Sequence, residues 1–99
     1  MEATTEIPEV YRLKLYITGA SPNSAKAVNN IKNICEKFLK DRYQLEIIDI
    51  YQQPLLAASQ QIIALPMLIK TSPLPAKRLI GNMSNVEKVL KGLDLSEIN

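Results

Sequence analysis

The sequence contains no histidine, no tryptophan and a single cysteine, Cys35. Without histidine, the chain lacks the side chain that most often serves as a general base or as a metal ligand near neutral pH. One cysteine cannot form an internal disulfide, which fits a reducing compartment. Paired carboxylates, clusters of metal-ligand residues and glycine-rich phosphate loops are also missing. We therefore expect no catalytic residue, no cofactor and no metal site.

Strong charge and long apolar runs are missing as well. The formal net charge is only +2, whereas a protein that binds nucleic acid carries a basic stripe with interleaved aromatic residues. No apolar run approaches the roughly 20 residues that a membrane helix needs. The first residues lack the basic region and apolar run of a signal peptide. We expect a cytoplasmic protein that binds neither nucleic acid nor membrane.

What the chain does have is enough apolar material for one small core. Its 99 residues are 46% hydrophobic, which suits a single packed domain and is too short for two. With one phenylalanine, the core must consist mainly of leucine, isoleucine and valine. Residues 1–8 are expected to form a loose polar lead-in to a domain that spans 1–99. Cys35 lies among apolar positions and is interpreted as a buried core residue.

The first half of the chain has the pattern of a strand, a helix and a second strand. Residues 11–17 alternate between apolar and polar side chains, which predicts a strand. Ser21 is suited to cap a helix over about 22–40, with Pro22 at its first position. Residues 43–50 are rich in β-formers without clean alternation, as in a strand covered on both sides. Such a βαβ unit has parallel strands and a right-handed crossover.

The second half predicts a short helix, a hairpin and a closing helix. Pro54 opens a helix through about residue 61, and residues 67–70 and 77–81 form two strands around a proline-rich loop. Ser84 and Glu87 have the spacing of a capping box, which predicts that Ser84 caps the last helix. Gly92 weakens or ends that helix. The predicted element order is β-α-β-α-β-β-α.

This order resembles thioredoxin-like proteins, which have a four-stranded mixed sheet packed with helices. In those proteins, the junction between the first strand and the first helix carries Cys-x-x-Cys, whereas here the same four residues read Ser21-Pro22-Asn23-Ser24. A hydroxyl cannot cycle through a disulfide, so disulfide exchange is excluded at this junction. Two interpretations of Ser21 stay open: a helix cap, or the thiolate-holding hydroxyl of a glutathione-binding or thiol-transfer enzyme.

Pro66 stands where thioredoxin-like folds carry a cis proline beside this junction. The resemblance implies a cis Leu65–Pro66 bond, although only about 5% of X–Pro bonds in folded proteins are cis. The alternative is an ordinary trans proline at the start of a strand.

Eight segments, in register over about residues 10–95, resemble the KaiB family of small circadian clock proteins. They are Leu13–Tyr16, Gly19–Ser24, Tyr43–Asp49, Leu65–Pro66, Leu74–Pro75, Lys77–Gly81, Glu87–Leu90 and Gly92–Leu95. The sensor domain of the clock histidine kinase SasA is a weaker match. A sensor domain cut from a kinase is a further interpretation, which we disfavour because the sequence ends at Asn99.

The KaiB resemblance implies a non-catalytic module that docks on a KaiC-like ATPase. KaiA-like or SasA-like proteins are the further partners that it implies, together with a homo-oligomer, either dimer or tetramer. Family position and expected exposure suggest one set of partner contacts: Lys14, Tyr16, Lys26, Leu45, Ile47, Lys70, Lys77 and Arg78.

The resemblance also implies a second, resting fold in which the C-terminal half is packed differently. The positions expected to bias or slow this switch are Pro66, Pro73, Pro75, Gly92 and Asp94. Uncatalysed proline isomerisation takes about 10–100 s, which suits a slow switch. An alanine at Gly92 favours continued helix by roughly 1 kcal/mol, and we expect it to enrich the monomer.

Three departures from the family pattern favour a divergent member. Residues 58–61 read Ala-Ser-Gln-Gln where the family has an acidic cluster, Leu65-Pro66-Met67 replaces Thr-Pro-Thr, and Gly81-Asn82 replaces Gly-Asp. Timekeeping and a stress response both remain open as the system that the protein serves.

Overall fold

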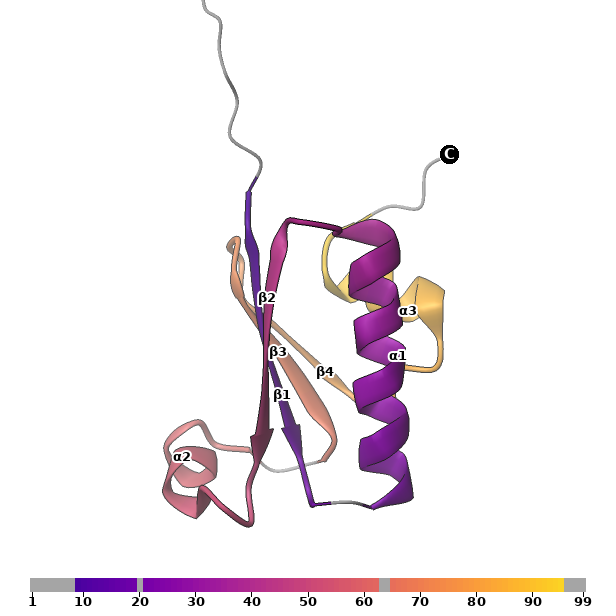
Figure 1. Cartoon of the computed structure of the whole chain (residues 1–99). Coiled ribbons are helices and arrows are strands. Elements are labelled where there is room, and N and C mark those ends of the chain that lie inside the picture. The colour runs from indigo at the N-terminus through magenta and orange to yellow at the C-terminus, as the bar shows by residue number, and fades with distance from the viewer. Residues whose placement is uncertain (1–8, 20, 63–64, 96–99) are drawn as a thin grey trace, which may run out of the picture.

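The computed structural model describes residues 9–19, 21–62 and 65–95, and the expected lead-in over 1–8 lies outside this part of the chain. The described residues have the predicted element order (Figure 1). The elements are β1 (Tyr11–Ile17), α1 (Pro22–Phe38), β2 (Tyr43–Asp49), α2 (Pro54–Ser59), β3 (Met67–Ser72), β4 (Lys77–Ile80) and α3 (Val86–Gly92). No helix in these ranges is long and apolar enough to cross a membrane.

The four strands form one mixed sheet in the order β2-β1-β3-β4. β1 and β2 are parallel, as the βαβ pattern predicts, and Leu13 lies beside Leu45. β3 is antiparallel to both β1 and β4. β1 is therefore a central strand, while β2 and β4 are the two edges. This arrangement confirms the thioredoxin-like fold class, with a four-stranded mixed sheet and three helices.

Helix α1 begins where the sequence predicts. Ser21 has extended backbone angles, and its Oγ accepts a hydrogen bond from the Ser24 N–H at 3.2 Å. Pro22 occupies the first turn, where its missing N–H leaves no intrahelical bond unmade. The helix ends at Phe38, two residues before the predicted end, and Leu39 donates its N–H to the Cys35 carbonyl.

The two faces of the sheet carry different helices (Figure 1). We call them the α1/α3 face and the α2 face. Apolar side chains of the sheet, α1 and α3 meet on the α1/α3 face, including Leu13, Leu15, Ile31, Leu68 and Leu90. A smaller cluster occupies the α2 face, formed by Tyr16, Ile48, Met67 and Ile69 with Leu56, Ile62 and others around them. This difference follows from the alternation of strand side chains between the two faces.

The predicted capping box of α3 is wrong, because Asn85 caps the helix in place of Ser84. Asn85 Oδ1 accepts the Lys88 N–H at 3.1 Å, and the helix starts at Val86. Ser84 instead donates its N–H to Asn82 Oδ1 at 3.1 Å, in a turn where Met83 has a φ of 63°. This turn occupies residues 82–84, so α3 begins one residue later than the sequence predicts.

The turn between β4 and α3 is also tied to α1. Asn30, on α1, donates from Nδ2 to the Asn82 carbonyl oxygen at 2.8 Å. This bond spans 52 residues of sequence. It fixes the start of α3 relative to the helix that crosses the same face of the sheet.

Candidate functional site

The junction at the N-terminus of α1 holds three hydroxyl side chains, from Thr18, Ser21 and Ser24. Ser21 Oγ donates to Ser24 Oγ at 2.8 Å, and Ser24 Oγ also accepts the Thr18 N–H at 3.1 Å. Ser24 is buried. The three groups thus bond to one another and to the backbone, and the predicted cap at Ser21 is confirmed. A hydroxyl with its hydrogen-bonding capacity used in this way is suited to holding the junction rather than to attacking a substrate.

Asp49 strengthens the same junction from the end of β2. Its Oδ1 accepts the Gly19 N–H at 3.1 Å and the Tyr51 N–H at 2.9 Å. Its bond to Gly19 is made across 30 residues, so no local pattern indicates it.

The single thiol of the chain is not a reactive group. Cys35 is fully buried on α1, and its burial raises the pKa of the thiol to about 12, with a smaller contribution from the negative charge of Glu36. A thiol attacks disulfides as the thiolate, which burial of this kind disfavours. The interpretation of Cys35 as a core residue is confirmed. Within the described ranges, no group of three or more cysteine, aspartate or glutamate side chains is arranged to hold a metal ion.

Pro66 follows a cis peptide bond, as the thioredoxin-like resemblance implies. The Ser72–Pro73 and Leu74–Pro75 bonds are also cis. The carbonyl of Pro66 accepts the Gly81 N–H at 3.0 Å, which extends the pairing of β3 with β4 by one residue.

The predicted partner contacts do not gather on one surface. Lys26 is exposed on α1, whereas Lys14 is half-buried on the α2 face of β1. Leu45 and Ile47 are half-buried on the edge strand β2 and pack against the core of the α1/α3 face. The structure therefore separates these residues into the helix surface, the sheet edge and the opposite face.

Two of the predicted contact residues are buried, so the expectation that they are exposed is wrong. Tyr16 is 0% exposed on the α2 face, and its hydroxyl has no hydrogen-bond partner among the described residues. Lys70 is 1% exposed on the α1/α3 face. Both lie on the inner strands β1 and β3, where packed elements cover both faces.

Lys70 is buried because its charge has a partner. Its Nζ lies 2.9 Å from Asp94 Oδ2 and 5.8 Å from the centre of the Tyr11 ring. Lys77 Nζ reaches Asp94 Oδ1 at 3.7 Å. We call Lys70, Lys77 and Asp94 the Asp94 clasp. The hydrogen bond from Lys70 is the main reason that the pKa of the Asp94 carboxyl is lowered. The clasp fastens the chain after α3 to the inner strand β3.

Gly92 lies against β4 at the end of α3. A Cβ on Gly92 would overlap Leu79 Cδ2 and lie 2.8 Å from Leu79 Cδ1. The sequence-based expectation for Gly92 considers helix propensity alone. The structure adds a close contact, which opposes that propensity. Of the positions expected to bias the fold, Asp94 is part of the clasp and Gly92 precedes it at the end of α3. Pro73 and Pro75 are in the loop between β3 and β4.

Arg78 connects β4 to the segment after α2. Its guanidinium donates to the carbonyl oxygens of Gln60 at 2.7 Å and Gln61 at 3.2 Å. It also approaches Met67 Sδ at 3.7 Å. The sequence indicates an exposed cation at this position but gives no sign of its backbone partners 17 and 18 residues away.

Comparisons with known proteins agree with the family resemblance. The KaiB domain model matches residues 14–95 of this chain. The circadian clock protein KaiB3 of Synechocystis is 52% identical over 83 residues, which cover 84% of this chain and 81% of that protein. The circadian clock oscillator protein KaiB of Thermosynechococcus vestitus is 48% identical over 87 residues, which cover 88% of this chain and 81% of that protein.

Solved structures agree on the fold. The N-terminal domain of Synechococcus elongatus SasA superposes with a TM-score of 0.71 at 20% identity, covering 100% of this chain and 97% of that one. Chloroplastic thioredoxin z superposes with a TM-score of 0.69 at 14% identity, covering 87% of this chain and 80% of that one. Identities at this level support the fold alone. Together, the sequence matches and the thioredoxin-like architecture place the chain in the KaiB family.

Proposed function

We propose that the protein is a non-catalytic interaction module that docks on a KaiC-like ATPase, in a circadian-clock or stress-response system. The observation that carries this proposal is a KaiB-family chain whose α1 N-terminus has only hydroxyls where redox relatives carry thiols. Ser21 and Ser24 bond to each other, and the one thiol is buried with a raised pKa. A scaffold of this kind acts through the surface that it presents.

The accessible members of the predicted contact set favour a partner with an acidic and partly apolar surface. Lys14, Lys26, Lys77 and Arg78 are exposed or half-buried cations, and Leu45 and Ile47 lie along an edge strand. Complementary charge speeds the encounter and fixes the orientation of a complex. Tyr16 and Lys70 are buried on inner strands, so in this fold they would not touch a partner directly. Proteins similar to KaiA or SasA are further proposed partners.

We further propose that the C-terminal half has a second packing in a homo-oligomeric resting state. The Asp94 clasp supports this, because its buried ammonium, that of Lys70, is held by one half-exposed carboxylate. Two packings need to differ by only a few kcal/mol for such a switch. Size-exclusion chromatography with light scattering would measure the oligomer, and its dissociation should accompany binding of the ATPase.

Binding to a KaiC-like ATPase encoded near the same gene tests the docking proposal. We expect co-purification that depends on whether ATP is present. Lys26→Glu should weaken binding about tenfold, a change of about 1.4 kcal/mol. Lys40→Glu is the matched control, since it makes the same charge change at another exposed site beyond the end of α1. Equal weakening by both variants, or no complex in either nucleotide state, would contradict the proposal.

A glutathione titration tests the competing class of function. The proposal expects no saturable binding at millimolar glutathione. Binding at that level, if abolished by Ser21→Ala, would replace the interaction module with a thiol-transfer enzyme. Ser24→Ala is the companion variant, because it removes the other hydroxyl of the same pair.

A further inference from the structure

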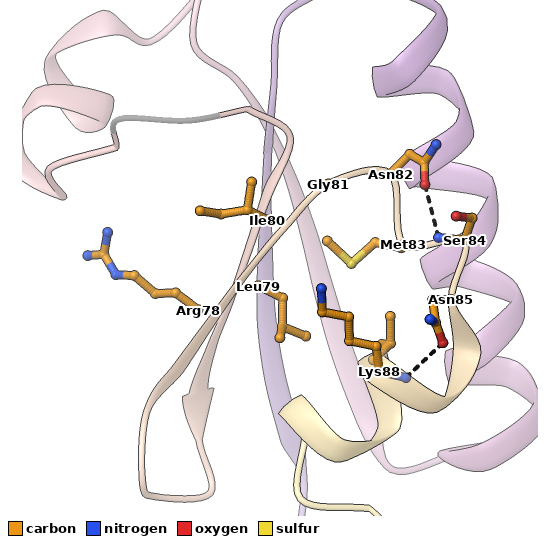
Figure 2. Close-up of a pocket in the computed structure, with 10 residues that line it drawn as sticks. Arg78, Leu79, Ile80, Gly81, Asn82, Met83, Ser84, Asn85 and Lys88 are labelled. Atoms are coloured by element: carbon orange, nitrogen blue, oxygen red, sulfur yellow. Dashed lines mark hydrogen bonds between the residues drawn. The ribbon is translucent and has the colours of Figure 1, made fainter.

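A groove runs beside the edge strand β4, between that strand and α3. Its volume is about 360 Å³, and residues of β4, of the following turn and of α3 line it. We call it the β4/α3 groove. Figure 2 shows Leu79 on the groove side of β4, facing Met83 and Lys88, while Arg78 and Ile80 point to the other side of the strand. Leu79, Met83 and Val89 give the groove an apolar floor.

Within the part of the chain that the structure describes, the backbone of β4 offers a short row of unpaired hydrogen-bonding groups to this side. Gly81 donates its N–H to the Pro66 carbonyl, and Ile80 lies opposite Met67 in the antiparallel ladder. Hydrogen-bonded and non-hydrogen-bonded pairs alternate along such a ladder. Lys77 and Leu79 therefore bond to β3, and the N–H and C=O groups of Arg78 and Ile80 point outward from the sheet. β4 is the last strand on that side.

From these observations we propose that the β4/α3 groove binds an extended acidic peptide of a partner protein, which adds to β4 as a fifth strand. Peptides often bind in this way, with main-chain bonds to an edge strand and alternate side chains in a neighbouring groove. The inference goes beyond docking on the ATPase and does not depend on it. An antiparallel peptide would bond to Arg78 and Ile80 and place one side chain between them in the groove.

The charges around the groove identify the occupant as acidic. Arg78 and Lys88 are among the described residues that line the groove, and no carboxylate is among them. The Lys88 side chain lies on the groove side, whereas the Arg78 side chain points to the other side of β4. Arg78 uses three of its five N–H donors on Gln60, Gln61 and Met67, and the other two have no partner among the described residues. Ile80 is 60% exposed on the same side of the strand as Arg78. The matching order in the peptide is an apolar residue against Ile80, an acidic residue toward Lys88, and an acidic residue against Arg78.

A second copy of the chain is the less suitable occupant. Antiparallel pairing of β4 with β4 through Arg78 and Ile80 would place Arg78 of each copy diagonally across from Arg78 of the other. Like charges on opposed strands disfavour pairing, and lysine on an edge strand is a common means of preventing it. An acidic peptide reverses this effect and makes the same charges favourable.

The test is an NMR titration of the ¹⁵N-labelled full chain with a nine-residue peptide. The peptide carries Ile-Glu-Asp at its centre, flanked by serine and threonine. We expect saturable binding below about 1 mM, with the largest amide shifts at Arg78 and Ile80. The control peptide carries Ile-Lys-Lys and should bind at least about tenfold more weakly. Equal binding of both peptides, or no shifts at these amides at several-fold higher concentration, would overturn the proposal.

Methylated peptides test the strand geometry without changing the protein. Methylation of the amide of the central Ile or Asp removes a bond to β4 and should weaken binding about fivefold or more. Methylation of the Glu amide, which faces away from β4, is the matched control and should have little effect. If all three methylated peptides bind alike, the peptide does not add to the sheet.

A pair of variants makes the same test from the side of the protein. Ile80→Pro removes the outward N–H and leaves the bonds of Lys77 and Leu79 to β3, since proline is tolerated at an edge position that faces solvent. It should abolish peptide binding, whereas Ile80→Val should retain it. Sedimentation of the unbound chain checks the alternative occupant: a dimer that Ile80→Pro converts to monomer would assign the edge to a second copy and overturn the peptide proposal.

Discussion

The α1/α3 face and the α2 face of the same sheet differ in how completely they are covered. α1 has 17 residues with a side-chain cap at Ser21, and it packs on a continuous apolar cluster. α2 has six residues and no side-chain cap, and its Leu55 is 85% exposed. Stability is therefore concentrated on one side. The side with fewer buried contacts is the one that can open or rearrange at low free energy.

Each face also contains a buried polar side chain, and these two side chains differ in whether they have a partner. Lys70, on the α1/α3 face, is paired with Asp94 and lies near the Tyr11 ring. The Tyr16 hydroxyl, on the α2 face, is buried without a hydrogen-bond partner in the part of the chain that the structure describes. An unsatisfied buried hydroxyl opposes folding, whereas a paired charge fixes one arrangement of its surroundings.

Truncation of one leucine on each face should give the largest difference. Leu15→Ala removes a fully buried side chain of the α1/α3 face and should lower the free energy of unfolding by about 2–5 kcal/mol. Leu56 packs half-buried at the margin of the α2 face, so Leu56→Ala should cost about 1 kcal/mol. Urea denaturation measures both. Losses of equal size would mean that the two faces contribute alike.

The Asp94 clasp should respond unequally to the removal of its two main partners. Asp94→Asn leaves the Lys70 ammonium buried without its counter-charge, whereas Lys70→Met leaves a half-exposed carboxylate that water can solvate. We expect Asp94→Asn to lower the melting temperature more than Lys70→Met does. The reverse order would show that Lys70 is buried for its contacts and not for its charge.

The same clasp predicts how stability depends on pH. The Lys70 hydrogen bond lowers the pKa of Asp94 in the folded state, below the usual value of 3.8. This stabilisation is fully present above that usual value and is lost as the pH falls through the lowered folded-state pKa. Urea titrations between pH 6 and pH 3 should show that the free energy of unfolding falls as the pH falls. This decrease should be smaller in Asp94→Asn than in the unchanged protein. If the decrease is the same in both proteins, carboxylates other than Asp94 cause it.

Removal of the unpartnered hydroxyl should stabilise the less covered face. Tyr16→Phe deletes a buried group that lacks a hydrogen-bond partner within residues 9–19, 21–62 and 65–95, so the free energy of unfolding should rise by about 1 kcal/mol. Tyr43→Phe is the control, because the Tyr43 hydroxyl donates to Glu36 at 2.6 Å. That variant should lose about 0.5 kcal/mol. A loss in Tyr16→Phe would show that the hydroxyl has a partner in solution.

The smallest expected effect concerns Gly92 on the α1/α3 face. Gly92→Ala gains roughly 1 kcal/mol of helix propensity but forces Leu79 aside, which typically costs about 1–3 kcal/mol. Because Leu79 is only partly buried and its tip can move, the variant should be about 0–1 kcal/mol less stable. In a Leu79→Ala background, the same change should be stabilising by about 1 kcal/mol. Additive effects in this double-mutant cycle would contradict the contact.

The sequence predicts the first half of the fold well because its signals are local. Alternation over 11–17, the Ser21-Pro22 cap and the apolar spacing of α1 each lie within one element, and all are confirmed. The cap of α3 was predicted at the wrong residue, since Ser84 and Asn85 both suit the role. A contact between Asn82 and the Ser84 N–H decides between them.

The candidate site was less predictable because burial depends on neighbours distant in the sequence. Lys70 and Tyr16 have the side chains of surface residues, yet each lies on an inner strand. Their partners or coverings come from residues around 94 and from α2, which no local pattern connects to them. The contacts of Arg78 were equally hard to predict, because its hydrogen bonds go to backbone carbonyls that the sequence does not reveal.

The bond from Asn30 to the Asn82 carbonyl connects the βαβ half of the chain directly to the other half. It is made by an amide on the most regular helix and an acceptor in the turn that positions α3. Any rearrangement that moves this turn leaves the amide with water in place of its acceptor. The Asn30 amide therefore reports whether the turn between β4 and α3 keeps the position that it has in this fold.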